Sequence, residues 1–231
     1  MLINMKRKGY MLLVFLVTLF VTESNITAQE ALEITVQADK PGAEIQSSMW
    51  GVFFEDEFAN GEVTTKWGGL RAQMGHAPLL AHVDEWQWRP DLIWFDNLTT
   101  IGTPNYYVQK FFSNYKGTAV VPVLSNGKSL TGQDGVFASS SIEMKTEKLY
   151  VKVVNSTNQI KPVAITLGPL PYLNIALKET LKSGSKDDFN SISNPKLIYP
   201  ASKPVKVAGR KINAEAEPLS VSVFIIDFKT R

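Results

Sequence analysis

The sequence predicts a mainly β protein whose second half folds as an antiparallel β-sandwich. Beyond Ala119, short runs of alternating apolar and polar residues follow one another, separated by turn residues and without helices between them. Such a series is typical of antiparallel sheets packed face to face. The clearest runs are Leu149–Val154, Val163–Leu167 and Leu219–Phe228.

A further strand is predicted near the N-terminus, at Leu32–Ala38. Leu32, Ile34, Val36 and Ala38 share one face of this run, and the polar residues between them share the other. This period of two indicates a half-buried strand. The residues Asp39-Lys40-Pro41-Gly42 that follow are typical of a turn.

One helix is predicted between the two regions. Thr103 is a suitable N-cap, and Pro104 occupies the first helical position, where its missing N–H costs nothing. Gly117 is expected to end the helix. Apolar residues recur at helical spacing within it, namely Tyr107, Val108, Phe111, Phe112 and Tyr115.

The connections of the second half are predicted from their turn residues. We expect a loop at Gly132–Ser141, a hairpin turn at Asn155–Asn158 and a long surface loop at Lys182–Pro204, which is rich in Ser, Asp, Asn and Pro. Strands are predicted on either side, beginning with Val120–Leu124 and including Val205–Val207.

The N-terminus has the pattern of a secretory signal peptide. Lys6, Arg7 and Lys8 precede the apolar run Met11–Val21, which is short for a bilayer span, and the small residue Ala28 follows. We therefore expect residues 1–28 to be removed and the protein to be exported, to the periplasm or outside the cell; an uncleaved anchor is the alternative. The net charge is 24 − 22 = +2, and it falls to zero without Lys6, Arg7, Lys8 and Glu23.

Composition excludes several classes of function. A near-zero net charge without basic clusters argues against nucleic acid as a partner. The chain has no cysteine, and its two histidines, His76 and His82, lack metal-ligand spacing, so no metal site and no cofactor is expected. After removal of the signal, no membrane partner is expected either.

Aromatic and charged residues are concentrated in Ala77–Phe112. Three of the five tryptophans, Trp86, Trp88 and Trp94, fall within nine residues, among acids and Arg89. Such a surface can stack on a sugar ring and hydrogen-bond its hydroxyls. The alternative is an aromatic core with a solvated charged face.

The same segment carries a family resemblance. HVDEWQWRPDLIWFDN and GTPNYYVQKFFS resemble the end of the catalytic barrel in the α-L-arabinofuranosidases of glycoside hydrolase family 51, and QADKPGAEIQSSMWGVFFED resembles the start of that barrel. EFANGEVTTKWGGLRAQMG resembles the much later segment that begins at the catalytic nucleophile. The chain therefore resembles the beginning of the family joined to its end.

The resemblance implies a domain organisation. Residues 29–48 would add a strand to the sandwich, residues 49–117 would be a remnant of a (β/α)8 barrel, and residues 118–231 would form the C-terminal jelly-roll sandwich. A complete barrel takes about 250 residues, so this barrel cannot be whole.

The resemblance also implies site residues. Glu57, in Glu57-Phe58-Ala59, matches the nucleophile, and Glu55 matches an acid that contacts arabinose. Trp86, Trp88 and Arg89 match a loop near the substrate cleft. A retaining glycosidase needs two carboxyls that flank the scissile bond. The family's acid/base follows an Asn, and this sequence contains no Asn-Glu dipeptide.

Glu55 and Glu57 are a poor substitute for that pair. On one strand their Cα atoms would lie about 6.6–6.8 Å apart and on the same side, so they could not flank a sugar. A solvated acidic turn is the competing interpretation of these two residues.

Three functional hypotheses follow. The first is an exported remnant of a retaining α-L-arabinofuranosidase, which would act on arabinose-containing plant polysaccharides or oligosaccharides, without the full catalytic machinery. The second is a working hydrolase that another chain completes. The third is a non-catalytic sugar-binding module that uses Trp86, Trp88 and Trp94. Asn97 and Asn155 begin glycosylation sequons, although turn chemistry also explains Asn155.

Overall fold

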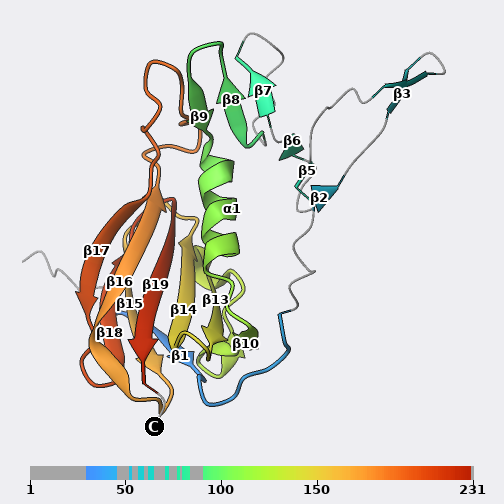
Figure 1. Ribbon diagram of the computed structural model, residues 1–231. Coiled ribbons are helices and arrows are strands. Elements are labelled where there is room, and N and C mark those ends of the chain that lie inside the picture. The colour runs from blue at the N-terminus through green and yellow to red at the C-terminus, as the bar shows by residue number, and fades with distance from the viewer. Residues whose placement is uncertain are drawn as a thin grey trace, which may run out of the picture.

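A computed structural model describes residues 30–45, 83 and 91–229, and the backbone of six short strands between residues 52 and 82 (Figure 1). These strands are β2 (Val52–Phe53), β3 (Glu57–Ala59), β4 (Glu62–Thr64), β5 (Arg71–Ala72), β6 (Ala77–Pro78) and β7 (Leu80–His82). The predicted signal peptide, residues 1–28, lies outside the described residues. Within the described part of the chain, no helix is both long and apolar enough to cross a membrane.

Two sheets packed face to face form the body of the protein, as predicted. The first has the order β12 (Lys128–Ser129), β11 (Val123–Ser125), β1 (Leu32–Val36), β15 (Lys161–Leu167) and β18 (Lys211–Ala216). The second has the order β10 (Ala119–Val121), β13 (Val136–Glu143), β14 (Lys148–Asn155), β19 (Ser220–Phe228), β16 (Tyr172–Lys182) and β17 (Ala201–Lys206).

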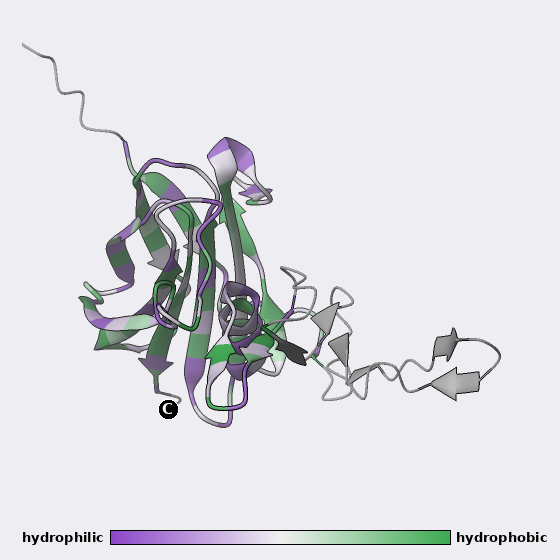
Figure 2. Ribbon diagram, turned by 90° about the horizontal axis from the view of Figure 1, so that it is seen from above, coloured by the Kyte–Doolittle hydropathy of each residue, from purple (hydrophilic) through white to green (hydrophobic). Residues whose placement is uncertain are grey.

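The main hydrophobic core fills the space between these sheets. Alternate residues of the longer strands point into it, and Figure 2 shows the resulting alternation of hydrophobic and hydrophilic residues along the ribbons. Its fully buried members include Ile34, Val151, Ile165, Ile212 and Ile226. Burial of branched aliphatic side chains from both sheets is the main stabilising term for such a sandwich.

The predicted N-terminal strand is confirmed and joins a sheet of the second half. β1 lies between β11 and β15, with Thr35 opposite Leu124 in one pair and opposite Thr166 in the other. Ile34, Val36 and Ala38 are buried, as the alternation predicted. The β1–β15 pair is parallel, whereas every other pair of the two sheets is antiparallel.

The predicted helix is α1 (Pro104–Asn114), which packs on the outer face of the six-stranded sheet (Figure 1). The Thr103 hydroxyl accepts a hydrogen bond from the Tyr106 N–H, which confirms the cap. Tyr107 and Phe111 are buried against Val223 and Leu181. Gly117 follows the helix with φ +65°, where a Cβ would lie 2.8 Å from the Ile142 carbonyl oxygen, so glycine is required there.

Two predicted connections are wrong. Asn155–Asn158 is not a hairpin turn, because β14 and β15 belong to different sheets and the segment carries the chain from one to the other. Asn155 is fully buried, and its amide donates to the carbonyls of Gln159 and Ala216. The predicted loop at Gly132–Ser141 is a strand from Val136 onward, since Ser140 pairs with Val151 and its hydroxyl donates to the Val121 carbonyl.

Besides β13, three strands of the sandwich were not predicted: β12, β16 and β18. β16 reverses the expected pattern: Ala176, Lys178 and Thr180 face the core, whereas Ile175 and Leu177 are exposed. The predicted surface loop at Lys182–Pro204 is confirmed for residues 183–200, and the following strand, predicted at Val205–Val207, begins earlier, at Ala201.

Ile34→Ala tests the contribution of β1. Ile34 is fully buried in the centre of the sheet, so its truncation should lower the free energy of unfolding by about 3 kcal/mol. Thr35→Ala is the matched control, because Thr35 is exposed on the same strand and should change it by less than about 1 kcal/mol. Urea unfolding of the full chain measures the free energy of unfolding of both variants. Equal losses would contradict the burial of Ile34 in the core.

Candidate functional site

The segment with the family resemblance forms a small sheet above α1 (Figure 1). β7 pairs in parallel with β8 (Ile93–Phe95), with Leu80 opposite Ile93, and β8 pairs antiparallel with β9 (Thr100–Gly102). The turn between β8 and β9 is fixed by Asp96, whose Oδ1 accepts hydrogen bonds from the N–H groups of Leu98 and Thr99. Parallel pairing of neighbouring strands is the arrangement that a (β/α)8 barrel uses. That residues 49–117 are a barrel remnant stays a prediction.

Of the predicted catalytic and substrate residues, only the backbone of Glu57 belongs to the described part of the chain. Glu57 begins β3, where it lies opposite Thr64 of β4 in a two-stranded sheet. Its side chain, and the residues Glu55, Trp86, Trp88 and Arg89, lie outside the described residues. Their roles therefore stay predictions.

Trp94 is a packing residue, which corrects its inclusion in a sugar-binding surface. Its side chain is only 5% exposed, and its indole N–H donates to Asp91 Oδ2 at 3.1 Å. Its ring meets Phe189 edge to face, with the ring centroids 6.0 Å apart. A ring held in this way cannot stack on a sugar in solution.

Hydrogen bonds anchor this segment to the sandwich. The amide of Asn190, which is fully buried in the loop after β16, donates to the carbonyl of Gly102 at the end of β9 and to that of Ile198. Within the segment itself, the buried Thr103 hydroxyl donates to the Asp91 carbonyl at 2.6 Å. The long loop 183–200 is thus a fixed connection between β9 and the six-stranded sheet.

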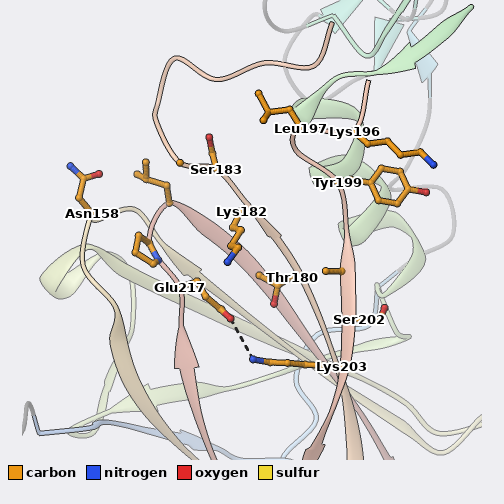
Figure 3. A pocket seen from close by; sticks show the side chains of 14 residues that line it. Asn158, Thr180, Lys182, Ser183, Lys196, Leu197, Tyr199, Ser202, Lys203 and Glu217 are labelled. Atoms are coloured by element: carbon orange, nitrogen blue, oxygen red, sulfur yellow. Dashed lines mark ion pairs between the residues drawn. The ribbon is translucent and has the colours of Figure 1, made fainter. Parts of the chain in front are cut away.

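A pocket of about 730 Å³ lies elsewhere, at one end of the sandwich (Figure 3). Its walls come from the end of β16, the start of β17, the turn between β18 and β19, and the loop after β16. Hydrophilic lining residues predominate: Asn158, Thr180, Lys182, Ser183, Lys196, Ser202, Lys203 and Glu217. The apolar side chains at the pocket are Leu197, Ala201, Pro218 and Leu219, and the ring of Tyr199 also lines it.

An ion-pair network forms one wall of this pocket. The Lys178 side chain is 0% exposed, and its Nζ lies 2.7 Å from Glu217 Oε2 and also donates to the Glu215 carbonyl. Glu217 Oε1 lies 3.5 Å from the Nζ of Lys203, which is largely exposed. Beside this network, the hydroxyls of Thr180 and Ser222 form a buried hydrogen bond. The core is therefore polar at this end.

Burial and pairing act in opposite directions on these groups. Burial lowers the pKa of Lys178, because a charged ammonium is poorly solvated there, and the Glu217 carboxylate opposes that effect. Burial alone would raise the pKa of Glu217. The hydrogen bond from Lys178 and the charges of Lys178 and Lys203 bring it below its usual value, so Glu217 is ionised at neutral pH.

Among the described residues, no group of three His, Asp or Glu side chains could hold a metal ion.

The structure explains the second sequon. Asn155 is buried, and its Oδ1 accepts hydrogen bonds from the Thr157 N–H and hydroxyl. Asn97, by contrast, is exposed beside the Asp96 turn.

Comparison with known proteins decides the family. The family model described as "Alpha-L-arabinofuranosidase C-terminal domain" matches residues 74–220, which is more than half of the chain. The chain belongs to the α-L-arabinofuranosidase family. α-L-Arabinofuranosidase 2 of Arabidopsis thaliana is 29% identical over 171 residues, covering 64% of this chain and 24% of the relative. The extracellular exo-α-L-arabinofuranosidase of Streptomyces chartreusis is 55% identical over 47 residues, covering 20% of this chain and 6% of the relative.

Solved arabinofuranosidases share the fold. The structure of the arabinose-bound MgGH51 enzyme matches with a TM-score of 0.60 and 24% identity, over 66% of this chain and 24% of that one. The arabinose complex of the Thermotoga maritima enzyme matches with a TM-score of 0.53 and 20% identity, over 60% of this chain and 32% of that one. The match of the family model confirms the arabinofuranosidase family that the sequence resemblance predicted. The chain spans about a quarter of the length of the Arabidopsis relative.

Sequence reasoning missed the pocket at the end of the sandwich. Lys178 pairs with the lining residue Glu217, and a lysine is expected at the surface when only the sequence is known. The one available signal was the alternation of Ala176, Lys178 and Thr180 with Ile175, Leu177 and Glu179, which has the period of a strand.

The ion-pair network predicts that Glu217→Gln and Lys178→Met lower the free energy of unfolding by different amounts. Glu217→Gln should lower the free energy of unfolding by about 3 kcal/mol, because it leaves the Lys178 ammonium buried without a carboxylate. Lys178→Met should cost less, because Glu217 keeps Lys203 and reaches solvent. Urea unfolding of the two variants compares these losses, and the reverse order would contradict the assignment.

The same pair predicts a pH dependence. A carboxyl whose pKa is lower in the folded state stabilises the protein above its unfolded pKa, and this contribution is lost as the pH falls through the folded pKa. The stability gap between the natural protein and Glu217→Gln should therefore be constant above about pH 5.5 and narrow below about pH 4.5. A gap that widens on acidification would contradict this.

Proposed function

We propose that this chain supplies the C-terminal β-sandwich of an α-L-arabinofuranosidase, together with strands and a helix from the end of its catalytic barrel, and that it does not hydrolyse arabinofuranosides by itself. The observation that carries the proposal is the match of residues 74–220 to the C-terminal domain of the family. The relatives support an arabinose-containing polysaccharide or oligosaccharide as the substrate of the whole enzyme.

The chemistry of retaining glycosidases gives the reason for the missing activity. The reaction needs a nucleophile and an acid/base whose carboxyl groups lie about 5–5.5 Å apart across the bond that breaks. Glu57 is the proposed nucleophile, but the sequence offers no acid/base in the Asn-Glu context. A second chain that contributed this carboxylate could complete the site, with Glu55, Trp86, Trp88 and Arg89 as sugar contacts.

Export is part of the proposal. It is supported by the signal-peptide pattern of residues 1–28 and by the name of the Streptomyces relative, which is called extracellular. N-terminal sequencing of the secreted protein tests it: cleavage after Ala28 is expected, and an intact N-terminus would contradict it.

Turnover of a chromogenic α-L-arabinofuranoside tests the catalytic part. We expect no release above the blank from the purified full chain, from Glu57→Gln or from Glu62→Gln. Glu62 is the matched control, because it lies in the same two-stranded sheet as Glu57 but outside the nucleophile motif. Turnover by the natural protein and by Glu62→Gln, but not by Glu57→Gln, would overturn the proposal.

A further inference from the structure

We propose that the pocket at the end of the sandwich is a carbohydrate-binding site for a sugar that carries a carboxylate, namely a uronic acid unit. The site is built by β16, β17, the β18–β19 turn, the loop after β16 and Asn158, without any residue of the barrel-like segment. It goes beyond the proposed function, because binding there does not require hydrolysis.

The size of the pocket suits a sugar. Its volume, about 730 Å³, falls in the range of small-molecule sites, roughly 300–1,000 Å³. Figure 3 shows Lys182, Thr180, Lys203 and Glu217 around one common space between the strands. Leu197, Pro218 and Leu219 add apolar surface, on which the C–H face of a sugar ring can pack.

The charge of the lining favours an anion. Lys182, Lys196 and Lys203 line the pocket against a single carboxylate, that of Glu217. The buried Lys178 already pairs with that carboxylate, so the lysines of the lining leave a net positive charge. Among the described residues, Lys182 and Lys196 have no ion-pair partner and are exposed, but Lys196 Nζ lies 5.2 Å from the centre of the Tyr199 ring, so Lys182 is the lysine chosen for the test. Asp188 lies near the rim, but Ser183, Gly184 and Ser185 all donate hydrogen bonds to its Oδ2.

The same lining disfavours a simple inorganic anion. Glu217 presents carboxylate oxygens close to the lysines, and a fully ionised sulfate has no donor for them, whereas the hydroxyls of a sugar can donate to them. The exposed amide of Asn158, at the opposite edge, can bond hydroxyls as donor or acceptor. A ligand that fits these groups carries one carboxylate and several hydroxyls on a ring. That is the chemistry of a uronic acid.

Calorimetric titration of the full chain with α-1,4-linked trigalacturonate tests the proposal. Lys182→Gln should weaken binding by about tenfold, because it removes a charge-assisted hydrogen bond. Lys206→Gln is the matched control, because Lys206 lies on the same strand as Lys203 but opposite Ile175, on the outer face of the sheet. Binding should also weaken between about 10 mM and about 150 mM salt, as screening increases. Thermal unfolding of both variants verifies that they remain folded.

Neutral arabinotriose and sodium sulfate are the comparison ligands. Tighter binding of trigalacturonate than of either, lost in Lys182→Gln and kept in Lys206→Gln, is the expected result. Equal affinity for sulfate would reduce the site to a general anion site, and equal affinity for arabinotriose would remove the role of the carboxylate. Either of these results overturns the proposal. So does an unchanged affinity of Lys182→Gln for trigalacturonate, or the absence of trigalacturonate binding by the natural protein. The titration measures binding and not hydrolysis, so the failure of this proposal and the failure of the proposed function can be told apart.

Discussion

Strand β1 holds the five-stranded sheet together because it lies at the centre of that sheet. Without it, the sheet would separate into two pairs, β11–β12 and β15–β18. Isolated two-stranded pieces are marginal in water, and each would lose one side of its hydrogen-bond ladder. β1 also brings Ile34, Val36 and Ala38 into the main core. The sandwich of the second half therefore depends on residues almost a hundred positions earlier in the chain, a constraint that makes the N-terminal strand indispensable to the C-terminal domain.

The two faces of the six-stranded sheet have different tasks. Its inner face closes the core, and its outer face receives α1 through Tyr107 and Phe111. Lys152, which is almost fully buried on this outer face, donates to the carbonyl of Tyr115 at the C-terminal end of the helix. A cation at this position complements the negative end of the helix dipole. The sheet thereby fixes the position of α1, which follows β9 in the chain. Through α1, the sandwich also positions the barrel-like segment.

The sequence predicted what depends on local pattern. The half-buried alternation of β1 and the Thr103-Pro104 start of α1 are local signals, and both are confirmed. The errors concern distant pairing. Asn155 has the chemistry of a turn, but nothing nearby indicates that it bonds Ala216 in the other sheet. Likewise, the sequence near Lys178 suggests a solvent-exposed lysine. Its partner Glu217 lies far along the chain, in the turn between β18 and β19. The catalytic part of the site depends on resemblance alone, because Glu57 has no local signal that separates a nucleophile from a surface acid.

A buried lysine in the core has a cost that indicates what the end of the sandwich is built for. Apolar residues of similar volume would stabilise that end at least as well as an ion pair, because two charges must be desolvated to form it. The network is not closed off from solvent, because the side chain of Glu217 is 17% exposed and that of Lys203 is 58% exposed. The charged groups therefore extend from the buried Lys178 to the solvent at the pocket. Partial exposure lowers the desolvation cost of the Glu217 and Lys203 charges. An ion-pair network that opens onto a cavity fixes the position of Glu217 beside Lys203, which is what recognition of an anionic, hydroxyl-bearing ligand requires.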